Sequence, residues 1–235
     1  EKDLDQAFVA PGELMTFDII KNDQIAITYQ KNQMLYLEIY DKDFNKITAN
    51  PILVSDDPRF PQGVGAGVNG VLHQDKKGGF YVIWQGGDGM NPTILWQYVD
   101  TSFNMANSSS GKMVSTNRVR GHAYAKSVYS PELDKVCLIW DEIMSYYNGI
   151  YGQLLNSDGS IDFAEAGKEI MPIGSNILGS DRIINHGNAF VLLYADKDPD
   201  SDITSIDNYN NALFLNQQLE PNTEIPNSNI RYSSL

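Results

Sequence analysis

The sequence is poor in cysteine, in histidine and in positive charge. Its 235 residues include one cysteine and three histidines, and its 17 basic and 30 acidic residues give a net charge of −13. A single cysteine excludes an internal disulfide, and the apolar run around Cys137 indicates a core residue. The negative charge argues against nucleic acid and acidic membranes as partners. No apolar run reaches the roughly 18–20 residues of a spanning helix, so membrane insertion is not expected.

The signatures of common enzyme classes are also missing. The sequence has no nucleophile elbow, no P-loop and no dinucleotide fingerprint. Residues 156–163 approach the Asp-box of sialidases, but Gly159 directly follows Asp158 and the segment has no tryptophan. These absences predict a protein without enzymatic activity and assign no catalytic residues.

What the sequence does contain is a repeat of about 55 residues. Four apolar runs end in an aromatic residue, at 25–29, 80–84, 136–140 and 190–194. The closing aromatics Tyr29, Trp84, Trp140 and Tyr194 are 55, 56 and 54 residues apart. Strand-like segments flank each run: first strands at 16–21, 70–74, 125–129 and 182–184, third strands at 34–40, 93–99, 149–155 and 212–215, and fourth strands at 52–55, 112–115, 169–171 and 223–225. Almost wholly apolar second strands are expected to be packed on both faces.

This organisation predicts an all-β fold, a β-propeller with four four-stranded antiparallel blades. The chain is then a single domain over residues 1–235, with repeats at about 11–58, 64–117, 121–174 and 175–228. Residues 3–9 and 230–233 lie outside the repeats and could seal the ring, because ring closure removes exposed strand edges. The alternative is part of a larger propeller completed by another chain.

The third repeat carries the most specific sequence pattern. Trp140-Asp141 is followed by Gly-Ile-Tyr-Gly-Gln at 149–153 and by Asn-Ser-Asp-Gly at 156–159, and the second repeat keeps Trp84-Gln85. This pattern resembles the repeats of large secreted or surface proteins of bacteria and ciliates, which are taken to form β-propellers. The resemblance covers the whole chain in pattern and about one repeat in detail. It implies a propeller fold and a secreted, extracellular or cell-surface location, and it implies no catalytic residues.

An acidic segment of the fourth repeat has the spacing of a calcium-binding loop. Its five aspartates are Asp196, Asp198, Asp200, Asp202 and Asp207. Such a loop needs several oxygen ligands and an apolar residue at its eighth position, which is Ile203 here. Ser201 replaces the usual glycine, and Asp207 replaces the usual bidentate glutamate. The two interpretations are a Ca²⁺ site in a β-hairpin and a solvated acidic loop.

The segments that lead into the first strands carry side chains suited to ligand binding. These residues are Arg59, Phe60, Arg118, Arg120, His122, Asn176 and Arg182. In a propeller such segments commonly line one mouth of the central channel. Guanidinium forks and ring faces suit a carboxylate or a sugar. The alternative is that the arginines only offset an acidic surface.

Asn107 begins the sequon Asn-Ser-Ser in a serine-rich loop, where a glycan could be attached in a eukaryotic secreted protein. The leading hypothesis is therefore a non-enzymatic extracellular β-propeller that recognises a glycan or an extracellular protein, or that associates with copies of itself. One alternative is a structural subunit of a fibre or surface layer. The other is a glycoside-active enzyme with paired carboxylates on different blades, for which the candidates are Glu13, Asp18, Asp141 and Asp181.

Overall fold

The computed structural model describes residues 11–56, 70–88, 91–117, 121–144, 147–174, 177–197, 208–222 and 228–229. This part of the chain contains sixteen β-strands and one short 3-10 turn, η1 (Lys21–Asp23). The strands form four antiparallel sheets of four strands each. None of the described residues belongs to a helix that is long and apolar enough to span a bilayer.

In every sheet the strands are neighbours in chain order, as expected of a meander. The first sheet consists of β1 (Glu13–Ile20), β2 (Gln24–Lys31), β3 (Met34–Tyr40) and β4 (Ile52–Ser55). The second consists of β5 (Val71–Gln74), β6 (Phe80–Asp88), β7 (Asn91–Val99) and β8 (Lys112–Met113). The third consists of β9 (Gly121–Ser130), β10 (Lys135–Met144), β11 (Tyr147–Leu155) and β12 (Lys168–Gly174). The fourth consists of β13 (Ile177–His186), β14 (Ala189–Lys197), β15 (Asn208–Leu215) and β16 (Ser228–Asn229).

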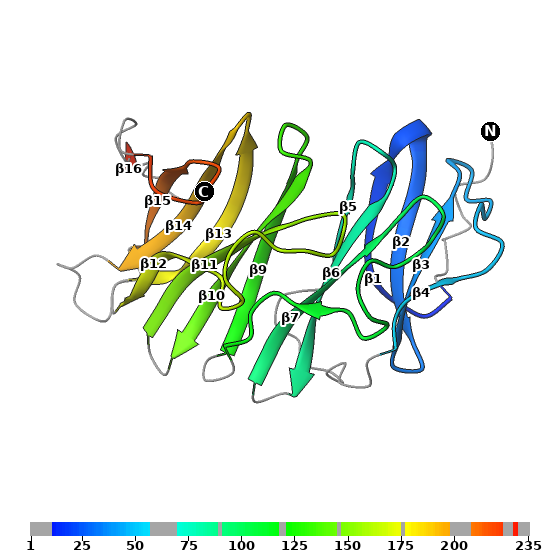
Figure 1. Cartoon of the computed structure of the whole chain (residues 1–235), viewed down its shortest axis with the longest axis horizontal. Helices are drawn as coiled ribbons and strands as arrows, with labels where there is room; N and C mark the ends of the chain where they lie inside the picture. The colour runs from blue at the N-terminus through cyan, green and yellow to red at the C-terminus, as the bar shows by residue number, and fades with distance from the viewer. Residues whose placement is uncertain are drawn as a thin grey trace.

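The four sheets stand side by side in chain order, from the blue first sheet to the orange and red fourth sheet (Figure 1). The first strand of each sheet contacts the first strand of the next, so β1, β5, β9 and β13 are the innermost strands. This arrangement confirms the predicted all-β propeller architecture. In the orientation of Figure 1, the first strands begin at the lower end of the sheets and the second strands return to it.

A four-bladed ring closed within the chain is not confirmed. The first and fourth sheets lie at opposite ends of the row in Figure 1, so the described strands form an open series. Residues 3–9 and 230–233, predicted to seal the ring, lie outside the described residues. A repeat fixes the spacing of the sheets along the sequence, whereas the number of blades in a ring depends on the rotation between neighbouring sheets.

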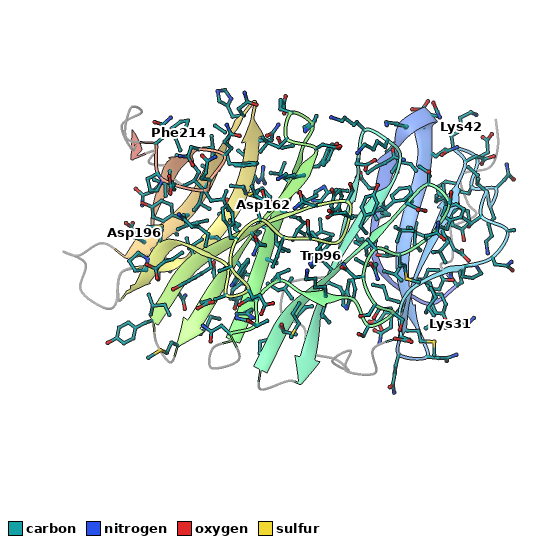
Figure 2. The ribbon with its side chains drawn as sticks, in the orientation of Figure 1. Lys31, Lys42, Trp96, Asp162, Asp196 and Phe214 are labelled. Carbon is teal, nitrogen blue, oxygen red and sulfur yellow. The ribbon has the colours of Figure 1, made fainter. Side chains whose placement is uncertain are left out.

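The core lies between successive sheets, and the second strands contribute to it on both faces. Leu138 and Trp140 of β10 pack toward the second sheet, and Cys137 and Ile139 pack toward the fourth. Figure 2 shows side chains filling the spaces between the sheets, with Trp96 near the middle of the row. Burial raises the pKa of the Cys137 thiol, which is a core residue as the sequence indicates.

The turn after each third strand has one conformation in all four sheets. It begins with an Asp or Asn that accepts backbone hydrogen bonds, and these residues are Asp41, Asp100, Asn156 and Asn216. Three positions later the backbone has a positive φ, at Phe44, Phe103, Gly159 and Leu219. In the first, second and fourth sheets the Asx side-chain oxygen accepts backbone N–H groups of the turn, as its type predicts, and in the third Asn156 Nδ2 donates to the Ser160 carbonyl oxygen instead.

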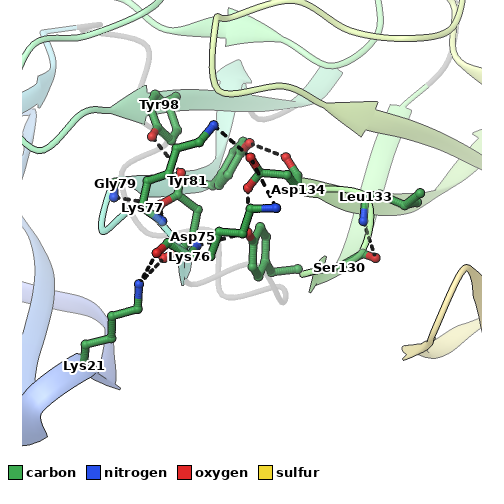
Figure 3. A network of polar contacts seen from close by, with 11 residues as sticks. Lys21, Asp75, Lys76, Lys77, Gly79, Tyr81, Tyr98, Ser130, Leu133 and Asp134 are labelled. Atoms are coloured by element: carbon green, nitrogen blue, oxygen red, sulfur yellow. Dashed lines mark hydrogen bonds and ion pairs between the residues drawn. The ribbon is translucent and has the colours of Figure 1, made fainter.

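Polar contacts join the sheets at their upper end (Figure 3). Lys21 of the first sheet donates a hydrogen bond from Nζ to the carbonyl oxygen of Asp75 in the second sheet, at 3.2 Å. Lys77 Nζ of the second sheet lies 2.8 Å from Asp134 Oδ2 of the third. The charged groups at this end therefore bind neighbouring sheets.

Candidate functional site

Three strands of the third and fourth sheets meet at the lower end. The strands β9 and β10 pair directly, and β13 packs against both of them. They bring together polar residues that lie far apart in the sequence: His122, Asp141, Glu142 and Ser180. Three of these four side chains are buried, although the sequence around them is otherwise typical of apolar strands.

Asp141 lies between the third and fourth sheets, where only 2% of its surface is exposed. Its Oδ1 accepts a hydrogen bond from the backbone N–H of Ser180 at 3.0 Å and another from the Ser180 hydroxyl at 2.6 Å. Burial raises the pKa of the Asp141 carboxyl to about 6, and the two Ser180 hydrogen bonds partly oppose this increase. The carboxyl can therefore exchange a proton near neutral pH.

Gly179 allows β13 to approach this carboxyl. A Cβ atom at position 179 would lie 2.5 Å from Asp141 Oδ2, which is far inside van der Waals contact. The backbone φ of Gly179 is also +152°, a region that residues with a side chain rarely adopt. Both the space and the backbone conformation thus require glycine beside Asp141.

Glu142 lies on the opposite face of β10, toward the second sheet. It pairs across the strands with His122, and Glu142 Oε1 lies 3.7 Å from His122 Nε2. The exposed fractions are 0% for Glu142 and 2% for His122, whose ring meets the Trp140 ring edge-on at 6.1 Å between centroids. Because adjacent strand residues point to opposite faces, Asp141 and Glu142 cannot flank one substrate bond. A carboxylate partner for Asp141 has to come from another sheet.

Asp181 of the fourth sheet is the candidate for such a carboxylate. It directly follows Ser180, the hydrogen-bond partner of Asp141, and its side chain is exposed. The two aspartates therefore belong to different sheets, as the paired-carboxylate alternative requires. The other two candidates, Glu13 and Asp18, lie exposed on β1 of the first sheet.

Three of the innermost strands are irregular at this end, and each has a register shift opposite the closing aromatic residue of its sheet. β13 has a second register shift, between Ile177 and Gly179. In the third sheet, Trp140 is opposed by two residues, Tyr124 and Ala125. In the fourth sheet, Ser180 pairs with Tyr194, and Asp181 is the extra residue of the bulge. The register of the first sheet shifts at Tyr29 in the same way. A bulge redirects side chains, so these positions present residues that a regular strand would not.

The residues predicted to bind ligands or metal are only partly described. His122 is buried beside Glu142, Arg182 is exposed on β13, and Asp196 on β14 accepts a hydrogen bond from Asn211 Nδ2 at 2.8 Å. The remaining predicted residues lie outside the described part of the chain: Arg59, Phe60, Arg118, Arg120, Asn176, Asp198, Asp200, Asp202 and Asp207. Within the described part, no three side chains are grouped as a metal site requires.

Asn107, the predicted glycosylation site, is half-buried in the loop after β7. Its backbone N–H donates to Gln97 Oε1 at 2.8 Å, and its Nδ2 lies 3.4 Å from the carbonyl oxygen of Trp96. The amide nitrogen that would carry a glycan is therefore directed toward β7, and glycosylation stays a prediction.

Comparisons with known proteins support a fold relationship. No protein-family model matches the sequence, and no curated protein matches it either. Among solved structures, an endo-arabinase from Bacteroides thetaiotaomicron is 10% identical, with a TM-score of 0.51 over 93% of this chain and 80% of that chain. A candidate glycoside hydrolase from Parabacteroides distasonis is 9% identical, with a TM-score of 0.50 over 93% of this chain and 73% of that chain. The likeness is one of fold.

These neighbours contradict the prediction of a non-enzymatic protein, because they are glycan-cleaving by name and favour the glycoside-active alternative. The prediction rested on the absence of a catalytic motif. Asp141 and Asp181 are 40 positions apart and form no motif, and only the packing of two sheets brings their strands together. That pairing is what the sequence argument missed, although both residues were among its candidates.

Proposed function

We propose that this protein is an extracellular enzyme that cleaves glycosidic bonds, with its active site at the lower ends of the third and fourth sheets. The observation that carries the proposal is the buried carboxyl of Asp141, whose pKa is raised to about 6, beside the strand that bears the exposed Asp181. The fold shared with an endo-arabinase supports a glycan as the substrate.

Glycoside cleavage needs a carboxylic acid that protonates the leaving oxygen and a second carboxylate across the bond. A raised pKa suits Asp141 to the first role, because the group is still protonated at mildly acidic pH. Ser180 holds this carboxyl in place, because its hydroxyl donates to Oδ1 and its backbone N–H lies within hydrogen-bond distance of both Oδ1 and Oδ2. The exposed Asp181 supplies the second carboxylate, either as a base for water or as a nucleophile.

His122 and Glu142 have a supporting role in this proposal. They lie on the far side of β10 from Asp141 and are buried against Trp140, so neither faces the same substrate bond. Their contact connects the start of β9 to the end of β10. We assign them as positioning residues that hold the end of β10, and with it Asp141.

The test is hydrolysis of a panel of neutral and anionic polysaccharides, measured as the release of reducing ends. In Asp141→Asn and Asp181→Asn the kcat/KM should fall by about 10²–10⁴-fold, the usual contribution of an acid–base group. Asp43→Asn is the matched control, because Asp43 is an exposed carboxylate in the turn after β3 at the other end of the molecule. The proposal fails if the unmodified protein cleaves nothing in the panel, or if Asp141→Asn retains full turnover.

A further inference from the structure

Tyr124 adopts a backbone conformation that is unusual for its type. Its φ is +54°, in the left-handed region, although it lies within β9. A bulky residue is strained in this region, and glycine would avoid the strain. Its ring is nonetheless 43% exposed, while the neighbouring Ala123 and Ala125 are buried. Neither backbone preference nor core packing therefore explains a tyrosine at this position.

Tyr124 lies at the bulge in β9. Tyr124 and Ala125 together oppose Trp140, so one residue of β9 is left over from the pairing. β9 is hydrogen-bonded to β10 along one edge, and its other edge belongs to the innermost layer between β5 and β13. The exposed Tyr124 thus belongs to one of the innermost strands and lies at its bulge.

Tyr124 is also adjacent to the proposed acid. The residue before it, Ala123, is the direct cross-strand partner of Asp141. In the fourth sheet, the position that corresponds to Tyr124 in the bulge is Ser180, which binds Asp141. Ser180 and Tyr124 thus occupy corresponding bulge positions, and Tyr124 directly follows the cross-strand partner of Asp141.

We propose that Tyr124 is a binding platform for one sugar ring of a neutral glycan, a role that rests on the proposed function. An exposed aromatic face packs well against the C–H face of a sugar, and its hydroxyl can bond to sugar hydroxyls. The class is neutral because the protein carries a net charge of −13 and the site itself contains Asp141, Glu142 and Asp181, which outnumber the nearby cations Lys126 and Arg182. Those charges repel uronic and sulfated sugars.

A competing explanation is that the strained tyrosine only shapes the strand. Phe103 provides a matched comparison, because it has a φ of +65° and is also 43% exposed, but it lies in the turn after β7. The third sheet has Gly159 at the corresponding turn position, which shows that the turn needs no aromatic ring. Phe103→Asn thus removes an exposed, left-handed aromatic residue away from the site.

The experiment measures binding in the Asp141→Asn background, so that turnover does not interfere. The probes are an arabinan oligosaccharide, a xylan oligosaccharide and polygalacturonate. Their binding is measured by titration calorimetry. Tyr124→Asn should weaken binding of a neutral probe by about tenfold or more, while Tyr124→Phe stays within about threefold. Asparagine tolerates the left-handed region, so the melting temperature should not fall. Phe103→Asn should leave binding unchanged.

Three results would overturn the platform: unchanged binding in Tyr124→Asn, preference for polygalacturonate, or no binding of any probe. The proposed reaction is tested separately. If Asp141→Asn still turns over substrate and Tyr124→Asn raises KM with little change in kcat, the acid assignment fails and the platform stands. If Asp141→Asn is inactive but Tyr124→Asn binds and reacts normally, the platform fails and the acid assignment stands.

Discussion

Asp141 of the third sheet accepts two hydrogen bonds from Ser180 of the fourth, from its backbone N–H at 3.0 Å and from its hydroxyl at 2.6 Å. This contact crosses the boundary between two sheets that is otherwise filled by apolar side chains. A buried carboxyl destabilises the folded state when it ionises. Its retention beside an exposed aspartate is therefore a reason to look for chemistry there.

The stability of the protein should fall as the pH rises through the titration of Asp141. The pKa is about 6 in the folded state and ordinarily 3.8, so between these values the folded state holds a proton that the unfolded state has lost. The loss is absent below about pH 4 and complete above about pH 6, at about 3 kcal/mol. Asp141→Asn should thus melt at a higher temperature than the unmodified protein at pH 7, and at a similar one at pH 4. Equal melting temperatures at both pH values would contradict the raised pKa.

Ser180→Ala should move the pH profile of the proposed activity. The Ser180 hydroxyl favours the ionised form of Asp141, so its removal raises the pKa of Asp141 further. Because the proposed acid acts in its protonated form, kcat/KM should decline with rising pH near 6 in the unmodified protein and at a higher pH in Ser180→Ala. The measurement is kcat/KM against pH from 4 to 9. If the decline of kcat/KM in Ser180→Ala occurs at the same pH as in the unmodified protein, or at a lower pH, Asp141 is excluded as the acid.

Gly179→Ala should destabilise the protein through Asp141. The new methyl group would lie 2.5 Å from Asp141 Oδ2 and would strain a backbone with φ of +152°. We expect a loss of about 1–3 kcal/mol in the free energy of unfolding, measured by urea titration. In an Asp141→Ala background the steric part should disappear and leave only the backbone strain, so the two effects should not add. Simple additivity would show that the carboxyl and Gly179 do not interact.

Much of the fold could be predicted from the sequence because the same pattern of apolar runs and turns occurs in four repeats. The spacing of Tyr29, Trp84, Trp140 and Tyr194 gives the sheets their order, and β4 runs over Ile52–Ser55 as predicted. The fourth-repeat strand predicted at 223–225 lies outside the described residues, while β16 is found at Ser228–Asn229. The closed ring was less predictable, since it depends on contacts between the first and last sheets.

The site was hidden from the sequence for a different reason. Trp140-Asp141 reads as the end of an apolar strand, and nothing in it shows that the aspartate is buried on the side of the fourth sheet. The bulges that redirect Tyr124 and Asp181 have no local signal such as a glycine at the shifted residue. They follow from how two strands pair, which a single strand does not reveal.

The turn residues of the repeat allow a test within one molecule. Asp100 Oδ1 accepts backbone hydrogen bonds from Ser102 and Asn104, both at 2.8 Å, and the third and fourth sheets have asparagine at the same place. Asp100→Asn should therefore leave the melting temperature near its original value, and Asp100→Ala should lower it. The Asn104 side chain, followed by these backbone hydrogen bonds, lowers the pKa of Asp100, so the contribution of Asp100 to stability is present above the ordinary pKa of 3.8 and is lost as the pH falls below it. A larger effect of Asp100→Asn than of Asp100→Ala would refute this role.

Calcium binding by the acidic segment stays a prediction, and it can be tested without knowledge of the substrate. Asp196 begins the segment at the end of β14 and is held by Asn211 of β15, which anchors one end of the proposed loop to the fourth sheet. If Asp198, Asp200 and Asp202 complete a set of oxygen ligands, millimolar calcium should raise the melting temperature and a chelator should reverse it. Asp198→Ala/Asp200→Ala should abolish the increase, while Asp41→Asn, in a turn of the first sheet, should not. An increase that persists in the double variant would place the ion elsewhere, and no increase in any variant would leave a solvated acidic loop whose charges repel anionic glycans.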